Sequence, residues 1–517
     1  MFQSIHLEVL RRLRAEFGDR YHQANVLLSA SHTHAGPGGT SGHAMVNLTT
    51  FGFRPVTFEA TIAGIVESIR RADRDFQPTT VSVSHSDVPG LVRNRSIEAF
   101  RRNPPAEQQR FPHGVNNSSL SLHLHRNGTH VGVMNWFAIH PTQLPPSNTR
   151  IHGDNKGAAA WVTEHNNGVD HTDLGHAPFV AAYAQSTPGD ISGNTALQPG
   201  TGLGNNPEEN TWIVGNRLAE DVRASATAGK TVSGAVSWRY AWRDMAAQRV
   251  PGRWTADGKP GTTGPAILGA AFAVSSQEDG GGVEWLPLNE GERGGNPLVA
   301  QLTGVMVPPE VKAYQHPKQG YTSGYGHYVT TPEEYEQQDY EGGATPFGRH
   351  QLPATQMIFH ELATALAQDK PVNSGQPAGD LTGKIPAAPA GGPRVDAPLP
   401  GRRYGDSLKR IAGVRRGEPV VAEFCAANPN NNIRHGDTYV RIERKEGSGW
   451  TTVATDNYWS VRVAFRVQAL AVTSRVTWST HAGNAPGRYR IRYFGDWRDL
   501  GGKTHPFVGV TNEFDVR

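Results

Sequence analysis

Residues 130–141, HVGVMNWFAIHP, are the stretch that decides the fold. This apolar run predicts a buried strand that ends at His140-Pro141. A second stretch, residues 179–194, FVAAYAQSTPGDISGN, predicts another strand that leads into a polar turn. Helical patterns alternate with such strands through the first part of the chain, which is typical of an α/β domain. Functional loops in such a domain are expected beyond the carboxyl ends of the strands.

Amphipathic helices are predicted on either side of these strands. Near the start, Ile5, Val9, Leu13 and Phe17 recur every four residues, and Gly18 follows at the position of a helix-ending glycine. Three more helices are predicted from similar patterns or from their capping residues. They lie in VTFEATIAGIVESIRRA (56–72), in TTPEEYEQQDYEGG (330–343), where Thr331, Pro332 and Glu334 predict a capping box, and in ATQMIFHELATALAQ (354–368).

The last part of the chain has a different pattern. Residues 370–400 are rich in Pro, Gly and Ala, which is typical of a linker. Beyond it, polar and apolar residues alternate with period two, as in GRYRIRYFG (487–495), and a hairpin is predicted around residues 447–449. We therefore predict an α/β catalytic domain over 1–369 and an all-β, immunoglobulin-like sandwich over 401–517.

The bulk composition limits the possible functions. The chain of 517 residues has a formal net charge of only +3, which argues against nucleic-acid binding. No run of 18 apolar residues predicts a transmembrane segment, and the N-terminus has no signal-peptide pattern. Because Cys425 is the single cysteine, any metal must be held by His, Asp, Glu or Tyr, and the 22 histidines allow that.

Histidines follow two of the predicted strands. In NVLLSASHTHAGPGG (25–39), a short apolar strand at residues 26–28 leads to His32 and His34, which are two residues apart. His140 ends the strand of residues 130–141. Two strands of one sheet that both end in histidine can bring His32 and His140 to one metal ion. A pair of hydrogen-bonded loop histidines remains the alternative.

Further polar residues lie in similar loops. Arg95, in RNRSIEAFRRNP, is able to bind a carboxylate or an oxyanion, and a solvated arginine is the alternative. Ser192 lies in a strand-to-loop turn, but its surroundings are not G-x-S-x-G, so a nucleophile elbow is not indicated. His152 and Asp154, in IHGDNKG, are additional candidates, although Asp154 fits turn chemistry better.

Several stretches together resemble one enzyme family, the neutral, non-lysosomal ceramidases. The matching stretches are LLSASHTHAGPGG, RNRSIEAFRRNPPAE, NWFAIHPTQL, HGDNKGAAAW, AQSTPGDISGN, YGHYVTTPEEYEQQDYEGGATPFG and, near the C-terminus, ANPNNNIRHGDTYVRIERKEGSGW and GRYRIRYFGD. They occur in the family's order and cover most of the chain. The resemblance is specific because so many stretches match in one order.

The resemblance implies a zinc-dependent amidohydrolase. Members of this family cleave the amide bond of ceramide to give sphingosine and a free fatty acid, with one Zn²⁺ in an α/β domain. By motif, His32, His140 and Tyr328 correspond to zinc ligands. The family also has a glutamate ligand in a PxExTT segment, and no counterpart is identifiable here; Glu310 lies nearby in a different context. Compared with the family, we expect this chain to lack that segment and the N-terminal strand region.

Other residues match positions that act on the substrate in the family. His34, Arg95 and Tyr340 correspond to residues that hold the zinc-bound water and the substrate oxygens, and Ser192 to a serine regarded as important for activity. The expected partner is ceramide or a related N-acyl sphingolipid, with peripheral contact to a membrane or a lipid micelle. The family is usually secreted or extracellular. Two alternatives remain: a degenerate member that binds lipid without turnover, and a secreted protein that binds carbohydrate or a surface through its β-sandwich.

Overall fold

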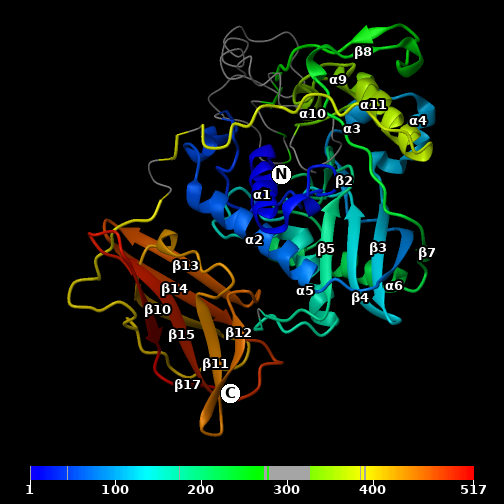
Figure 1. Cartoon of the computed structure of the whole chain (residues 1–517). Helices are drawn as coiled ribbons and strands as arrows, with labels where there is room; N and C mark the ends of the chain where they lie inside the picture. Colours follow the sequence, from blue (N-terminus) through cyan, green and yellow to red (C-terminus); the bar gives the residue numbers. More distant parts are fainter. Residues whose placement is uncertain are drawn as a thin grey trace.

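The computed structural model describes residues 2–43, 45–173, 175–269, 271–272, 276, 278, 326–384, 386–388 and 392–517. Figure 1 shows two parts: a first part of helices around a sheet, and a C-terminal part built of strands. This arrangement confirms the predicted combination of an α/β domain and an all-β sandwich.

A mixed sheet of five strands forms the centre of the first part. Its order is β5-β4-β3-β1-β7. The strands are β1 (Thr80–Asp87), β3 (Ser118–Arg126), β4 (Thr129–Phe137), β5 (Val180–Gln185) and β7 (Lys230–Val232). β4 and β5 run parallel, with α5 (Asp154–Asn166) between them in sequence, and the other pairings are antiparallel. The strand predicted over residues 130–141 exists but ends at Phe137, before the predicted end at His140-Pro141.

Helices lie against this sheet and beside it (Figure 1). α1 (Gln3–Phe17) and α2 (Pro55–Arg74) pack on each other, and α6 (Pro207–Ser225) packs on α5. The other elements of the first part are β2 (Arg93–Asn94), α3 (Ile97–Phe100), α4 (Pro105–Arg110), β6 (Ile191–Ser192), β8 (Arg249–Val250), β9 (Gly261–Thr262), α9 (Pro332–Tyr335), α10 (Tyr340–Gly343) and α11 (Gln351–Ala367). The four predicted helices are thus confirmed, although the third is two short helices, α9 and α10. The capping box of Thr331 and Glu334 is present as predicted.

One predicted strand is wrong. Residues 26–28 form no strand, although Val26 and Leu28 are buried and Leu27 is 69% exposed. The two buried side chains pack into the core between α1 and α2. The imidazole of His6 on α1 donates a hydrogen bond from Nε2 to the carbonyl of Val26 (3.1 Å), so a side chain satisfies a main-chain group that a neighbouring strand would otherwise satisfy.

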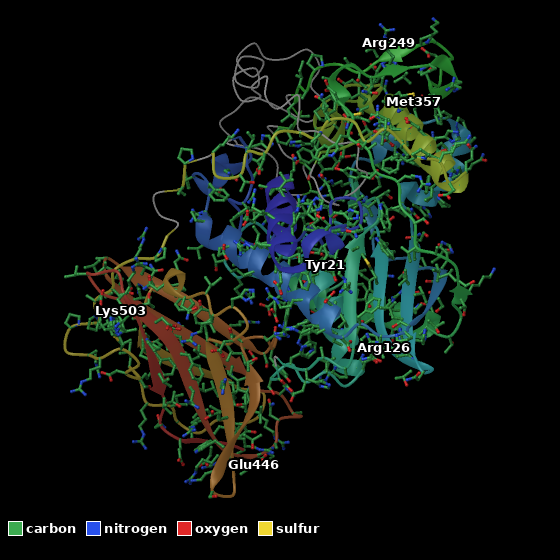
Figure 2. The ribbon with its side chains drawn as sticks, in the orientation of Figure 1. Tyr21, Arg126, Arg249, Met357, Glu446 and Lys503 are labelled. Carbon is green, nitrogen blue, oxygen red and sulfur yellow. The ribbon has the colours of Figure 1, made fainter. Side chains whose placement is uncertain are left out.

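The C-terminal part is a sandwich of two antiparallel sheets around one core. One sheet has the order β10-β14-β13, and the other β12-β11-β15-β16, with β17 also paired to β15. The strands are β10 (Pro419–Ala426), β11 (Val440–Glu446), β12 (Gly449–Thr455), β13 (Val461–Gln468), β14 (Ala471–Ser479), β15 (Gly487–Arg498), β16 (Thr504–Val510) and β17 (Phe514–Val516). β11 and β12 form the predicted hairpin, and Figure 2 shows Glu446 at its tip, pointing away from the first part.

Few regular elements connect the two parts. Between Ala367 and Pro419, none of the described residues belongs to a helix or a multi-residue strand. Hydrogen bonds to the sandwich are already present at Arg394, whose main-chain N–H donates to Oδ1 of Asn431 (2.8 Å). The carboxylate of Asp396 then accepts from the main-chain N–H groups of Asn428 (2.9 Å) and Arg498 (3.1 Å). Within the described part of the chain, the helices are all too short or too polar to cross a lipid bilayer.

Candidate metal centre

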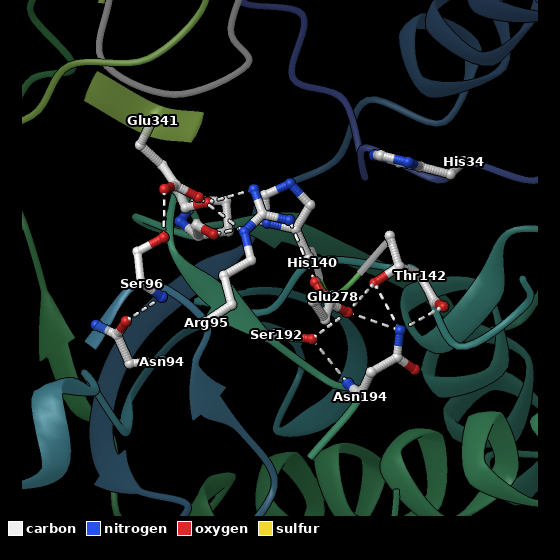
Figure 3. A network of polar contacts seen from close by, with 12 residues as sticks. His34, Asn94, Arg95, Ser96, His140, Thr142, Ser192, Asn194, Glu278 and Glu341 are labelled. Atoms are coloured by element: carbon white, nitrogen blue, oxygen red, sulfur yellow. Dashed lines mark hydrogen bonds and ion pairs between the residues drawn. The ribbon is translucent and has the colours of Figure 1, made fainter. Parts of the chain in front are cut away.

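A small ladder beyond the main sheet brings distant residues together. His140 forms an isolated parallel bridge with Ser192, and its main-chain N–H donates to the carbonyl of Ile191 (2.8 Å). On the other side, the N–H of Arg95 donates to the carbonyl of Asp190 (2.9 Å). Figure 3 shows the side chains of His140, Ser192 and Arg95 gathered at this place. The motifs that carry them are therefore neighbours in space.

His32 and His34 approach this ladder from the loop after residues 26–28. His32 adopts a left-handed backbone conformation with φ of 67°, which is uncommon for a residue other than glycine and is often found at functional sites. Its Nε2 lies 3.1 Å from Nε2 of His140 and 3.0 Å from Nε2 of His34. The prediction that His32 and His140 meet is confirmed, but a loop rather than a strand end delivers His32.

The three imidazoles are in the form that binds metals. Nδ1–H of His140 donates to the carbonyl of Pro188 (2.7 Å), which leaves the Nε2 lone pair directed toward His32. Burial, together with neighbouring histidine and arginine charges, holds the pKa values of His32 and His140 well below their usual range. Burial and the Arg95 charge also lower the pKa of His34 to about 4, although its side chain keeps an exposed edge. All three rings are thus neutral near pH 7.

Two tyrosines complete the surroundings of these histidines. The hydroxyl of Tyr328 lies 3.3 Å from Nε2 of His140 and accepts a hydrogen bond from Nη2 of Arg95 (3.1 Å). Tyr340 packs edge-to-face on Tyr328, with ring centroids 5.4 Å apart, and the Arg95 guanidinium lies 5.4 Å from the centre of the Tyr340 ring. Tyr328 therefore joins the nitrogen cluster directly, whereas Tyr340 lies behind it.

Arg95 is not the solvated arginine of the alternative interpretation. Its side chain is 1% exposed, and it forms ion pairs with Glu341 through Nε (2.7 Å) and with Glu278 through Nη1 (3.3 Å). Ser96 also donates to Glu341 (2.6 Å). Sequence reasoning missed both carboxylates. Glu341 follows Tyr340 directly and could have been found from that position, but Glu278 lies in a glycine-rich stretch with no periodic pattern.

Ser192 belongs to a second part of this network (Figure 3). Its hydroxyl donates to Oε1 of Glu278 (2.6 Å) and accepts from the main-chain N–H of Asn194 (2.9 Å). The Asn194 amide also donates to Glu278 (2.7 Å) and to the carbonyl of Thr142 (3.0 Å). Ser192 is completely buried. These contacts fix the ladder beside His140.

Asp154 has a structural role, as its turn context indicates. Its carboxylate is buried and accepts from the main-chain N–H groups of Leu144 (2.9 Å) and Asn155 (2.6 Å). Burial raises its pKa to about 6. The side-chain amide of Asn155 in turn donates to the carbonyl of His140 (3.1 Å), so the first turn of α5 holds the main chain of His140 in place. Glu310, the carboxylate considered from the sequence, lies outside the described residues.

The donor set fits a metal such as zinc. Zn–N bonds of about 2.0–2.1 Å in a tetrahedron place ligand atoms about 3.3 Å apart. Here the Nε2 atom of His140 lies 3.1 Å from Nε2 of His32 and 3.3 Å from the Tyr328 hydroxyl. The ligand nitrogens of His32, His34 and His140 all lie within 4.8 Å of one another. Neutral imidazoles and a tyrosine oxygen are ligands that suit Zn²⁺.

Comparisons with known proteins match both parts of this chain. Residues 1–320 and 318–357 match the family described as neutral/alkaline non-lysosomal ceramidase, N-terminal, and residues 359–516 match its C-terminal counterpart. The neutral ceramidase of Mycobacterium tuberculosis is 33% identical, over 99% of this chain and 90% of that protein. The neutral ceramidase of Pseudomonas aeruginosa is 31% identical, over 100% of this chain and 86% of that protein.

Solved structures give the same result. A structure titled as a ceramidase complexed with C2 superposes with a TM-score of 0.85 at 30% identity, covering 100% of this chain and 89% of the other. The alignment with the M. tuberculosis protein runs over 586 positions, more than the 517 residues here, so that relative carries segments without a counterpart in this chain. The agreement extends over both parts of the molecule, and the chain belongs to the neutral/alkaline non-lysosomal ceramidase family.

Proposed function

We propose that this chain is a zinc-dependent amidohydrolase that cleaves the N-acyl bond of ceramide to give sphingosine and a free fatty acid. One observation supports the proposal above all: His32, His140 and Tyr328 converge. Nε2 of His140 lies 3.1 Å from Nε2 of His32 and 3.3 Å from the hydroxyl of Tyr328. These three side chains are the proposed ligands of one Zn²⁺. When bound, the metal supplies Lewis-acid activation of water and of the amide carbonyl.

The chain's own residues then position the reacting groups. His34 faces the ligand cluster, 3.0 Å from His32, with an exposed edge, and we propose that it orients the attacking water and carries its proton to the leaving amine. Arg95 and Tyr340 are proposed to hold the oxygen of the substrate carbonyl as negative charge develops on it. Because the Ser192 hydroxyl donates to Glu278, its proposed role is to position the ladder rather than to attack the substrate.

We expect the protein to meet its substrate within a lipid assembly. Ceramide carries two long apolar chains, so we propose that the chain takes it from a membrane or a micelle by peripheral contact. The degenerate alternative, lipid binding without turnover, rests on the glutamate ligand that is not identifiable in the sequence. Metal content and product release separate the two.

The test compares the wild type with a His32→Ala/His140→Ala variant, each dialysed against zinc-containing buffer and then against buffer alone. The wild type should retain about one zinc per chain and release fatty acid from a short-chain ceramide in mixed micelles, whereas the variant should do neither. His113→Ala/His360→Ala, which removes two exposed histidines, is the matched control and should behave as the wild type does. Equal zinc content in both double variants would reject the site. Zinc retention without fatty acid release by the wild type would favour the degenerate alternative.

A further inference from the structure

A loop of the C-terminal sandwich contacts the first part of the molecule close to the metal centre. This loop, residues 456–460, joins β12 to β13. Its Trp459 packs edge-to-face on the imidazole of His152, with ring centroids 4.0 Å apart and an interplanar angle of 82°, and on Trp212 of α6 at 4.7 Å. The contact therefore joins the sandwich to the segment just before α5.

His152 holds the loop that carries two of the metal-site histidines. Its main-chain N–H donates to the carbonyl of Ala35 (2.9 Å), and its carbonyl accepts from the hydroxyl of Thr33 (2.7 Å). Thr33 and Ala35 flank His34, and Thr33 follows His32. A displacement of His152 would therefore move both imidazoles together.

The His152 ring has little freedom where it stands. Nδ1 accepts a hydrogen bond from the main-chain N–H of Asp154 (2.8 Å), and burial lowers the pKa of His152 to about 4, so the ring is neutral near pH 7. One edge of the ring is thus fixed by α5. Trp459 supplies the aromatic contact from the second domain.

We propose that Trp459 is a positioning residue for the metal centre, acting through His152 on the loop of His32 and His34. This inference rests on the proposed function in one respect, namely that the loop of His32 and His34 binds zinc. It adds that the affinity of the first domain for its metal depends on a side chain of the second. Removing a hydrogen-bond partner of a metal ligand typically changes metal affinity by about 10–100-fold, and we expect the effect of this more distant contact at the lower end of that range.

Neighbouring contacts allow this effect to be separated from simple domain attachment. Tyr458 belongs to the same loop, but its ring packs on Trp161 (5.8 Å) and on His171 (6.1 Å). Arg462 forms an ion pair with Glu208. A cavity of about 360 Å³, lined by Trp459, Tyr458 and His152 among others, borders the contact. Removing the indole therefore enlarges an existing space while the other contacts hold the two parts together.

The first experiment uses the full chain without metal and measures amide hydrogen exchange. Trp459→Ala should speed exchange about tenfold at the hydrogen-bonded amides of His34, Ala35 and His152, and Trp459→Phe should restore most of the protection. Tyr458→Ala removes an interface ring of similar size and should leave these amides unchanged. Equal exchange in the two alanine variants would overturn the proposal. If Trp459→Ala fails to fold, His152→Ala removes the other ring of the same contact and should show the same local loss of protection.

The second experiment measures zinc affinity by competition with a chromophoric chelator. Trp459→Ala should raise the dissociation constant about tenfold. His152→Ala, which also removes the acceptor of the Asp154 N–H, should raise it at least as much. The double variant should bind zinc no more weakly than His152→Ala, because Trp459 acts through that ring. Tyr458→Ala should stay within about threefold of the wild type. Additive losses would contradict the proposed route. Absence of zinc binding in the wild type would reject the proposed function, whereas the exchange comparison, made without metal, would still decide whether Trp459 positions the loop.

Discussion

Arg95 ties the candidate metal centre to two buried carboxylates. The pairs with Glu278 and Glu341 are almost fully removed from water. Two buried carboxylates without a cation are costly, since each charge loses its hydration. The arginine is therefore expected to stabilise the first domain as well as to meet substrate.

Replacing Arg95 tests this directly. Arg95→Met should destabilise the first domain by about 3–5 kcal/mol, because breaking a buried pair leaves an uncompensated charge. Adding Glu341→Gln should recover part of the loss. Arg101→Met, in which an exposed ion pair with Glu98 is lost, is the control and should change little. Denaturant unfolding followed by tryptophan fluorescence measures all four proteins; no recovery in the double variant would contradict the argument.

The two tyrosines allow the ligand role to be separated from the substrate role. Tyr328→Phe keeps the ring but removes the oxygen near His140, so zinc affinity should fall about tenfold or more. The ring of Tyr340 lies 5.4 Å from the ring of Tyr328, measured between their centroids. Tyr340→Phe should therefore keep the zinc affinity and lower kcat. Chelator competition and hydrolysis rates measure the two effects. Lower zinc affinity in Tyr340→Phe, with unchanged affinity in Tyr328→Phe, would show that the two assigned roles are the wrong way round.

At the scale of single elements, Lys156 is an unusual feature of α5. Its side chain is buried, its Nζ donates to the carbonyl of Phe137 (2.8 Å), and burial lowers its pKa to about 7. An unfolded lysine has a pKa near 10.4, so between about pH 7 and pH 10 the unfolded chain binds one more proton than the folded chain. Stability from this group therefore rises with pH across that window, by up to about 1.4 kcal/mol per pH unit.

Lys156→Met should remove this dependence. Between pH 7.5 and pH 9, the wild type should gain about 2 kcal/mol more in unfolding free energy than the variant. Urea unfolding of the metal-free proteins at both pH values is the measurement. Parallel pH profiles would show that Lys156 has an ordinary pKa.

The elements also show why part of the fold was predictable. In α1, Ile5, Val9 and Leu13 are buried as their spacing indicates, because helical geometry alone puts them on one face. Val26 and Leu28 are buried on either side of the exposed Leu27, which is the alternation of a strand. That alternation does not reveal whether a neighbouring strand is present to pair with the segment. Here α1 and α2 cover that segment instead, which sequence periodicity cannot show.

The site was predictable to a similar degree. His32 and His140 are recognisable because each follows an apolar run and carries a metal-binding group. Glu278 was missed because its position beside Arg95 and Ser192 depends on how the chain folds back over 183 residues. Likewise, the role of Trp459 depends on how two domains meet.

At the scale of the whole molecule, the sandwich has its own core and its own hydrogen bonds. A fragment of residues 392–517 should therefore unfold cooperatively without the first domain. A fragment of residues 401–517 lacks Asp396 and leaves the N–H groups of Asn428 and Arg498 without that acceptor, so it should be less stable by about 1–3 kcal/mol. Circular dichroism during thermal and urea unfolding measures both. A protease-sensitive, non-cooperative longer fragment would contradict an independent fold.

The proposed metal ligands are also widely spaced along the chain, with His32 108 residues from His140 and His140 188 residues from Tyr328. During synthesis, the ribosome must release most of the first domain before these atoms can meet. We therefore expect the proposed zinc to enter a domain that has already folded, rather than to act as a nucleus for folding. In refolding, the rate at which the metal enters should be set by the protein and should not increase with zinc concentration once zinc is in excess.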